Sequence, residues 1–130
     1  MLRKLSHREE FDMALRGHVR ARTEHFVFHL SSNSLEQETG LGSIVPKRWA
    51  KRAVTRNLIK REIREQAEQH LQELLPGSLG VVRLAATFSR DQYKSASSSL
   101  LGEALRAELC ILYARTVAKQ MQVNQKGAAA

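Results

Sequence analysis

One segment of this 130-residue chain combines a dense cluster of cations with an apolar repeat at helical spacing. Between Lys47 and Arg64 the chain has eight Lys or Arg residues and one acid, so this segment carries +7 of the chain's net charge of +8. Apolar residues recur along its second half at positions 59, 63, 67, 71 and 74. A helix with this pattern buries one face and exposes a cationic one. We expect it over about residues 50–75, ending at Pro76-Gly77.

The cationic side of this helix predicts a binding site for a polyanion. Charge added for solubility usually mixes both signs, whereas here the excess lies in one strip on a near-neutral body. At about 100° per residue, four polar residues share one arc of the helix surface: Asn57, Lys60, Arg61 and Arg64. Arg56 lies off this arc, where it either reaches a partner or packs along the apolar side. Four residues before the helix extend the strip: Lys47, Arg48, Lys51 and Arg52.

The rest of the sequence predicts a single α+β domain. We expect a short helix over residues 7–16, strands at 19–23, 25–30, 40–46 and 79–86, and a last helix from an Asp91 cap to Lys119. The order is α-β-β-β-α-β-α, with helices packed on a four-stranded sheet. The domain covers residues 1–120, and residues 121–130 are predicted to be a disordered tail. Leu101, Leu105, Leu109 and Leu112 form the core stripe of the last helix.

Composition argues against several classes of protein. No apolar run approaches the roughly 18 residues of a membrane-spanning helix. The only cysteine, Cys110, excludes an internal disulfide, fits the cytoplasm, and is expected to pack in the core. Acids occur as isolated pairs, and only His25 and His29 are predicted to share a face. We therefore expect neither catalytic residues nor a metal site in the protein itself.

The ordered basic motif resembles the protein subunit of bacterial ribonuclease P. It is carried by Lys47-Arg48, Lys51-Arg52-Ala53-Val54, Arg56-Asn57, Lys60-Arg61 and Arg64-Glu65. The pair Glu10-Phe11 and the strand HFVFHL extend the resemblance over most of residues 5–110. Five positions depart from the family pattern, among them Ala67 and Glu68, where the family tends to have an aromatic and a basic residue. Leu58 stands where the family usually has Arg, and Leu15 and His29 stand where aromatic residues are common.

The resemblance implies an endoribonuclease whose catalytic subunit is RNA. That RNA removes the 5′ leader of precursor tRNA with Mg²⁺ held mainly by RNA phosphates, and the protein is an accessory subunit. The partners implied are ribonuclease P RNA and precursor tRNA, with no membrane and no DNA. The nine polar and cationic residues named above (Lys47, Arg48, Lys51, Arg52, Arg56, Asn57, Lys60, Arg61, Arg64) would contact the catalytic RNA. The family also implies a left-handed β-α-β crossover, against the general rule.

The resemblance further implies a cleft for the single-stranded leader between the first helix and the sheet. Our candidates for it are Phe11, Val27, His29, Arg20 and Arg22, because flat and cationic side chains suit unpaired nucleotides. For Phe11 a core position is equally consistent. Val27 and His29 could instead lie on a strand face covered by the last helix, and the two arginines could simply be exposed.

Three other functions compete with this interpretation. A basic RNA-binding module without an enzymatic partner, such as a ribosomal protein, has a similar composition. A DNA-binding helix-turn-helix protein would need a short helix and turn before the basic helix, and the sequence predicts none. A self-sufficient protein nuclease would need clustered metal ligands.

Overall fold

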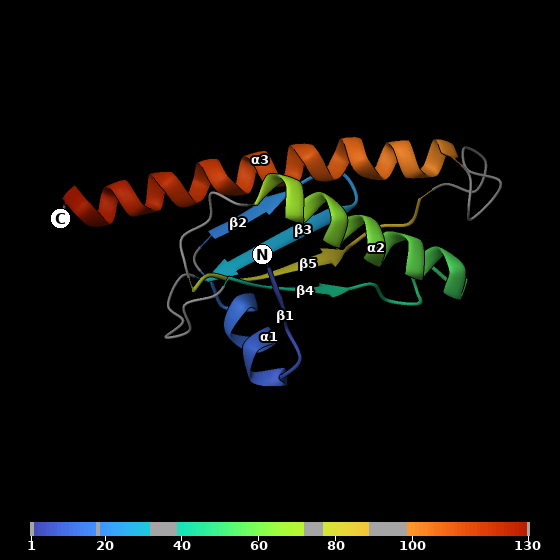
Figure 1. The fold of residues 1–130 in the computed structure, drawn as a ribbon, viewed down its shortest axis with the longest axis horizontal. Helices are drawn as coiled ribbons and strands as arrows, with labels where there is room; N and C mark the ends of the chain where they lie inside the picture. Colours follow the sequence, from blue (N-terminus) through green and yellow to red (C-terminus); the bar gives the residue numbers. More distant parts are fainter. Residues whose placement is uncertain (1, 18, 32–38, 72–76, 89–98, 130) are drawn as a thin grey trace.

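The computed structural model describes residues 2–17, 19–31, 39–71, 77–88 and 99–129. Its five strands form one sheet in the order β1-β4-β5-β3-β2 (Figure 1). The elements, in chain order, are β1 (Arg3–Lys4), α1 (Arg8–Leu15), β2 (Val19–Arg22), β3 (Phe26–Ser31), β4 (Gly40–Ile44), α2 (Ala53–His70), β5 (Leu79–Leu84) and α3 (Ser99–Ala129). The predicted α+β class is confirmed, with one strand more than expected.

The additional strand is β1, which pairs in parallel with β4. Two residues are too few to show an alternating pattern, so this strand could not be predicted. The Arg3 guanidinium donates a hydrogen bond to Glu10 of α1, and this bond is the main reason why the pKa of that carboxyl lies below its ordinary value. The N-terminal segment is thereby joined to both the sheet edge and α1.

The long helices differ from their predicted bounds at the ends. Helix α2 begins at Ala53 rather than near residue 50, because Arg52 is still extended, and it ends at His70. Leu74 and Asp91 lie outside the described residues. The backbone of α3 continues to Ala129, so the structure has helix where the sequence predicts a disordered tail. The domain boundary at residue 120 stays a prediction.

The connection from β4 through α2 to β5 is left-handed. The two strands are adjacent and parallel. In Figure 1 both run to the right, α2 lies in front of the sheet, and β5 lies above β4. This is the uncommon hand that the resemblance implied.

The main core lies between the sheet and the two long helices. Phe26, Phe28 and Leu30 project from β3 onto the predicted stripes of α2 and α3, and the four α3 leucines are at most 3 % exposed. The Tyr113 hydroxyl, also buried here, donates a 2.7 Å hydrogen bond to the Ile63 carbonyl. Cys110 is exposed, so its predicted core position is wrong. It follows the buried Leu109 and turns outward from the stripe.

The second face of the sheet is partly covered by α1. A smaller apolar cluster, with Leu5, Ala14, Leu79 and Val81 buried and Phe11 packed against them, holds α1 there. Helix α3 contacts β2 and β3 from the opposite face, the one that carries Phe26 and Phe28. Val27 and His29 alternate with these residues and therefore lie on the α1 side. The alternative in which the last helix covers them is excluded.

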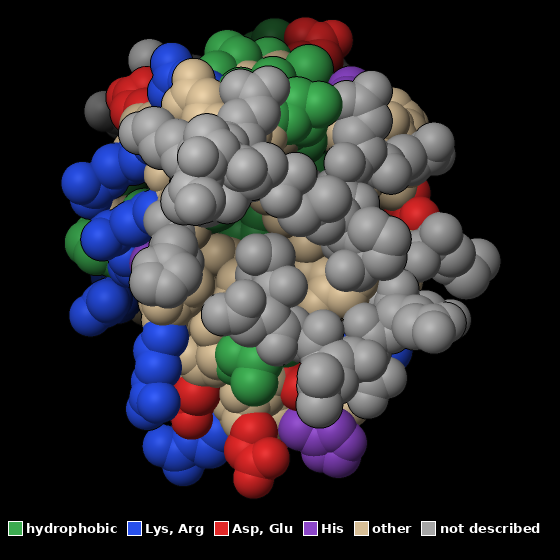
Figure 2. All heavy atoms as spheres, turned by 90° about the vertical axis from the view of Figure 1, so that its left-hand side faces the viewer, with side chains coloured by type: hydrophobic (Ala, Val, Ile, Leu, Met, Phe, Trp, Pro, Cys, Tyr) green, Lys and Arg blue, Asp and Glu red, His purple; other side chains and the backbone are tan. Residues whose placement is uncertain are grey.

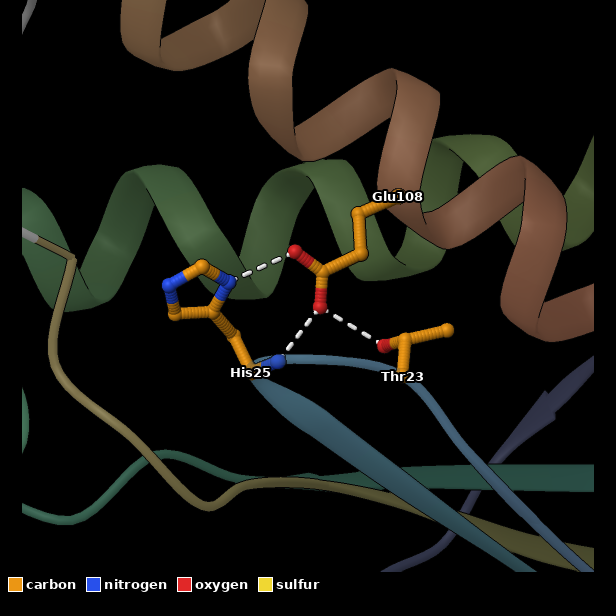
Figure 3. Close-up of polar contacts among 3 residues, drawn as sticks. All are labelled: Thr23, His25 and Glu108. Atoms are coloured by element: carbon orange, nitrogen blue, oxygen red, sulfur yellow. Dashed lines mark hydrogen bonds and ion pairs between the residues drawn. The ribbon is translucent and has the colours of Figure 1, made fainter.

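Glu108 of α3 binds the connection between β2 and β3 (Figure 3). Its carboxylate accepts hydrogen bonds from the Thr23 hydroxyl (2.6 Å), the His25 backbone N–H (2.7 Å) and the His25 ring Nδ1 (2.7 Å). The His25 ring also stacks on Phe88, with centroids 3.8 Å apart. His25 precedes the first residue of β3 and turns toward α3. The expectation that it shares a face with His29 is therefore wrong.

Replacing Glu108 with alanine should lower the free energy of unfolding by about 2–3 kcal/mol, because three donors lose a charged acceptor in a largely buried place. Urea unfolding followed by circular dichroism measures the change. Glu103→Ala, on an exposed position of the same helix, is the matched control and should differ from the parent by less than about 0.5 kcal/mol. Equal losses in the two variants would contradict the role assigned to Glu108.

Candidate nucleic-acid interface

The exposed face of α2 brings together the residues predicted from its helical arc. Asn57, Lys60 and Arg61 are exposed, while Ile59 and Ile63 on the opposite side are 1 % exposed. Burial of the apolar side fixes the rotation of the helix, so the amide and the two cations point away from the core together. Side chains in this arrangement can meet successive phosphates along one strand of nucleic acid.

Two arginines of the motif also have partners within the protein. The half-buried Arg64 donates a short hydrogen bond to the Leu2 carbonyl and lies 3.8 Å from Glu68. Arg56 donates to the carbonyls of Ala50 (3.0 Å) and Lys51 (2.8 Å). Arg56 thus stabilises the turn before α2, which distinguishes it from the outward-facing Lys60 and Arg61.

The turn before α2 extends the cationic strip. Lys47, Arg48, Lys51 and Arg52 are all exposed. Between them Trp49 packs partly into the main core, and the Arg48 guanidinium lies 5.3 Å from the centre of its ring. The Thr87 hydroxyl donates a 3.0 Å hydrogen bond to the Trp49 carbonyl, which ties this turn to the segment after β5. The turn is therefore anchored while its cations remain in solvent.

Leu58 lies on the flank of α2, where the cationic face borders the main core. It is partly buried and packs against the main core. A residue at this position borders the core rather than the centre of the cationic face. The departure from the family pattern therefore adds apolar contact and removes one charge from the flank of the strip.

A cavity of about 520 Å³ lies beside the cationic face of α2, between α1, β1 and β4. Apolar side chains line part of it: Leu5, Phe11, Leu41 and Ile63. The cations that line it are Lys4, Lys60, Arg61 and Arg64. Gly42 is needed in its wall, because a Cβ there would lie 2.5 Å from the Phe11 ring. Phe11 is half-buried, so it contributes to the small apolar cluster and also lines the cavity.

The α1 face of the sheet carries the other predicted leader residues. In the β2–β3 pairing Arg20 lies opposite His29 and Arg22 opposite Val27. Both arginines are exposed, whereas Val27 is completely buried and offers no surface to a ligand. Arg83 of β5, opposite Val27, was not predicted, although the alternation in VVRL could have placed it on this face. Figure 2 shows Lys and Arg side chains following one another down its left-hand edge, which is the rear of the view in Figure 1.

His29 is the polar centre of this face. It is 8 % exposed, and its Nε2 has no hydrogen-bond partner in the described part of the protein. Burial, and then the positive charges of Arg83 and Arg20, hold the pKa of His29 below its ordinary value of 6.5. The ring is therefore neutral near pH 7 and can accept or donate one hydrogen bond there.

The lowered pKa of His29 predicts how stability depends on pH. Below about pH 6.5 the unfolded chain protonates this ring while the folded state resists, so acidification should destabilise the fold. The loss in free energy of unfolding between about pH 7.5 and about pH 5.5 should be smaller in His29→Phe, in which the other histidines still titrate. Unfolding in urea at both pH values tests this. An unchanged pH dependence in the variant would exclude His29 as a source.

Comparison with known proteins identifies the family. The family model described as Ribonuclease P matches residues 2–108. The chain belongs to the ribonuclease P protein family. The ribonuclease P protein component of Ralstonia pickettii is 38 % identical over 87 residues, which are 67 % of this chain and 61 % of that protein. The Burkholderia pseudomallei component is 33 % identical over 101 residues, 78 % of this chain and 72 % of that protein.

Solved structures support the fold of the ribonuclease P family for this chain. The Staphylococcus aureus RNase P protein superimposes with a TM-score of 0.67 at 22 % identity, covering 92 % of this chain and 98 % of the other. The Thermotoga maritima protein gives a TM-score of 0.60 at 20 % identity and covers 85 % of this chain and 94 % of the other. Within the described residues, no helix has the length and hydropathy that crossing a bilayer requires. Membership of the family sets aside the ribosomal-protein and helix-turn-helix alternatives.

Proposed function

We propose that this chain is the protein subunit of a ribonuclease P, an endoribonuclease in which RNA is the catalyst. It docks on that RNA through the cationic strip and holds the 5′ leader of precursor tRNA while the leader is removed. One observation carries the proposal: Lys60, Arg61 and Arg64 belong both to the outer face of α2 and to the lining of the cavity at Phe11. A single cationic surface thus connects an RNA-docking helix to a site with an aromatic ring.

Docking on the catalytic RNA uses the strip from Lys47 to Arg61. Lysine offers a mobile charge and arginine a planar fork, and both displace counterions from phosphates. The affinity should therefore fall steeply with salt. Arg64 and Arg56 have half-buried side chains with bonds to backbone carbonyls. We propose that these two arginines hold the backbone of the RNA-binding surface in place and also contact the RNA.

Holding of the leader uses the cavity and the α1 face of the sheet. A nucleotide base can stack on the accessible part of Phe11 while its phosphates meet Lys60, Arg61 or Lys4. The exposed Arg20 and Arg22, with Arg83, offer charge for further phosphates, and the neutral His29 ring offers one hydrogen bond. Because mature tRNA lacks the leader, these contacts favour precursor over product.

The hydrolytic chemistry is assigned to RNA-bound magnesium. Among residues 2–17, 19–31, 39–71, 77–88 and 99–122, no three His, Cys, Asp or Glu side chains come close enough to hold a metal ion. The face proposed to meet the RNA is cationic, which does not fit direct coordination of Mg²⁺ by protein carboxylates. The protein's part is to neutralise phosphate repulsion and to position the substrate. We place the complex in the cytoplasm, which suits a chain with a single cysteine.

Binding of precursor and mature tRNA to the reconstituted holoenzyme tests this function. The parent protein should raise the affinity for precursor relative to mature tRNA. Phe11→Ala should reduce that ratio by a factor between about 5 and about 150, because it removes a stacking ring worth about 1–3 kcal/mol. Leu15→Ala, on the same helix and outside the cavity lining, is the matched control. A ratio that is the same with and without the protein would contradict the assigned leader contact.

A further inference from the structure

One wall of the cavity at Phe11 is formed by a very short strand. Lys4, the second residue of β1, and Leu5, which follows it, line the cavity from the N-terminal segment. Strand β1 has two residues and lies at the edge of the sheet, where it pairs only with β4. Strands are usually three residues or longer, so this wall depends on further contacts to stay in place.

An ion pair between Arg3 and Glu10 supplies a directed contact from this wall to α1, which lies beside β1 (Figure 1). The Arg3 Nη2 and the Glu10 Oε2 are 2.5 Å apart, and their side chains are 26 % and 17 % exposed. Water therefore screens their attraction less than that of a pair on the open surface. The Glu10 carboxylate also accepts a 3.4 Å hydrogen bond from the His7 backbone N–H at the start of α1. Glu10 thus joins the first turn of α1 to β1.

Both members of the pair stand directly before a residue that lines the cavity. Arg3 precedes Lys4, and Glu10 precedes Phe11. Arg3 and Glu10 themselves are outside the lining. The ion pair therefore acts on the cavity through these two neighbours, one of which carries a charge for a phosphate and the other a ring for a base.

The other contacts of the N-terminal segment do not fix α1 in the same way. The Leu2 carbonyl accepts its hydrogen bond from Arg64, which holds the segment to α2 rather than to α1. Leu5 packs in the small apolar cluster with Phe11. Apolar burial is not directional, whereas a charged hydrogen bond sets both distance and orientation. The position of α1 relative to β1 thus depends most on Arg3 and Glu10.

We infer that Arg3 and Glu10 are positioning residues for the 5′ leader. Their ion pair holds Lys4 and Phe11 at the separation at which one nucleotide can stack on the ring while its phosphate meets the ammonium group. A site that is already ordered binds more tightly, because less conformational freedom is lost on binding. The inference rests on the function proposed above and adds to it two residues that do not touch the leader.

The sign of the effect of Glu10 separates positioning from charge. Glu10 is an acid beside a site for a polyanion, so its charge by itself opposes leader binding. If charge were its only influence, removing it would strengthen the binding of the leader. A positioning role predicts the opposite result, namely that loss of this acid weakens leader binding.

Binding of precursor and mature tRNA to the holoenzyme, assembled from the full chain and ribonuclease P RNA, tests the inference. Glu10→Gln keeps the size of the side chain and an oxygen that can accept from His7, and it should lower the ratio of precursor to mature affinity by about three- to tenfold. Its affinity for ribonuclease P RNA should stay within about twofold of the parent, which shows that the fold and α2 are intact. Glu9→Gln is the matched control, because it removes the same charge from the exposed neighbouring position, and its ratio should equal or exceed that of the parent.

Arg3→Gln is the second variant and should lower the same ratio. The double variant Arg3→Gln, Glu10→Gln should lose no more than the larger of the two single losses, because both substitutions remove one interaction. A ratio in Glu10→Gln equal to or above that of the parent, or losses that add in the double variant, would overturn the inference and leave the proposed function intact. A parent that does not favour precursor over mature tRNA would overturn both.

Discussion

Replacing Lys60 and Arg61 together with alanine should weaken binding of ribonuclease P RNA by about 2–4 kcal/mol, the largest functional effect we expect from two substitutions. Both side chains are exposed, point away from the core, and line the cavity that we assign to the leader. Their loss should also flatten the dependence of log affinity on log salt by about 1.4, or about 0.7 for each phosphate contact to single-stranded RNA. Filter binding between about 50 and 200 mM salt measures both quantities.

A matched control separates the position of the charges from their number. Arg115→Ala with Lys119→Ala also removes two exposed cations, but from α3, where they donate to the carbonyls of Arg22 and Arg20. This variant should keep most of the RNA affinity. Equal losses in the two double variants would mean that net charge, rather than the face of α2, determines binding.

Leu109→Ala should cost about 3–5 kcal/mol of unfolding free energy, the largest effect on stability that we expect from one substitution. Leu109 is completely buried in the core between the sheet and the long helices, so the deletion leaves a cavity that its neighbours cannot fill. Cys110→Ala changes the adjacent, exposed residue and should stay within about 0.5 kcal/mol of the parent. Chemical unfolding compares the two. A loss below about 1 kcal/mol for Leu109→Ala would show that α3 is not the structural support we describe.

The main core could be predicted from the sequence because helical spacing reports burial directly. Ile59, Ile63 and the four leucines of α3 are buried as predicted. Helical spacing does not predict the surroundings of residues beside the apolar stripe, or of elements too short to show a repeat. Cys110 was assigned to the apolar side, but it lies just beyond the stripe and is exposed. A strand of two residues, such as β1, carries no period and was missed.

The cationic strip could also be predicted, whereas the partners of its members could not. Whether Arg56 faces RNA or a carbonyl depends on the turn at Ala50 and Lys51, and Arg64 depends on Leu2, which is 62 residues away. The sequence alone was equally consistent with a core position and a leader-binding position for Phe11. The structure gives it both surroundings, because the cavity includes Gly42, whose missing side chain leaves space for the ring.

Cleavage of precursor tRNA by ribonuclease P RNA at low magnesium, with and without this protein, decides whether the chain acts as a ribonuclease P subunit. We predict that the protein restores removal of the 5′ leader under conditions in which the RNA alone is slow, and that the protein without the RNA cleaves nothing. The Lys60→Ala, Arg61→Ala double variant should need a higher protein concentration for the same rescue. A protein that binds the RNA and leaves the cleavage rate unchanged would contradict the assignment as a functional subunit.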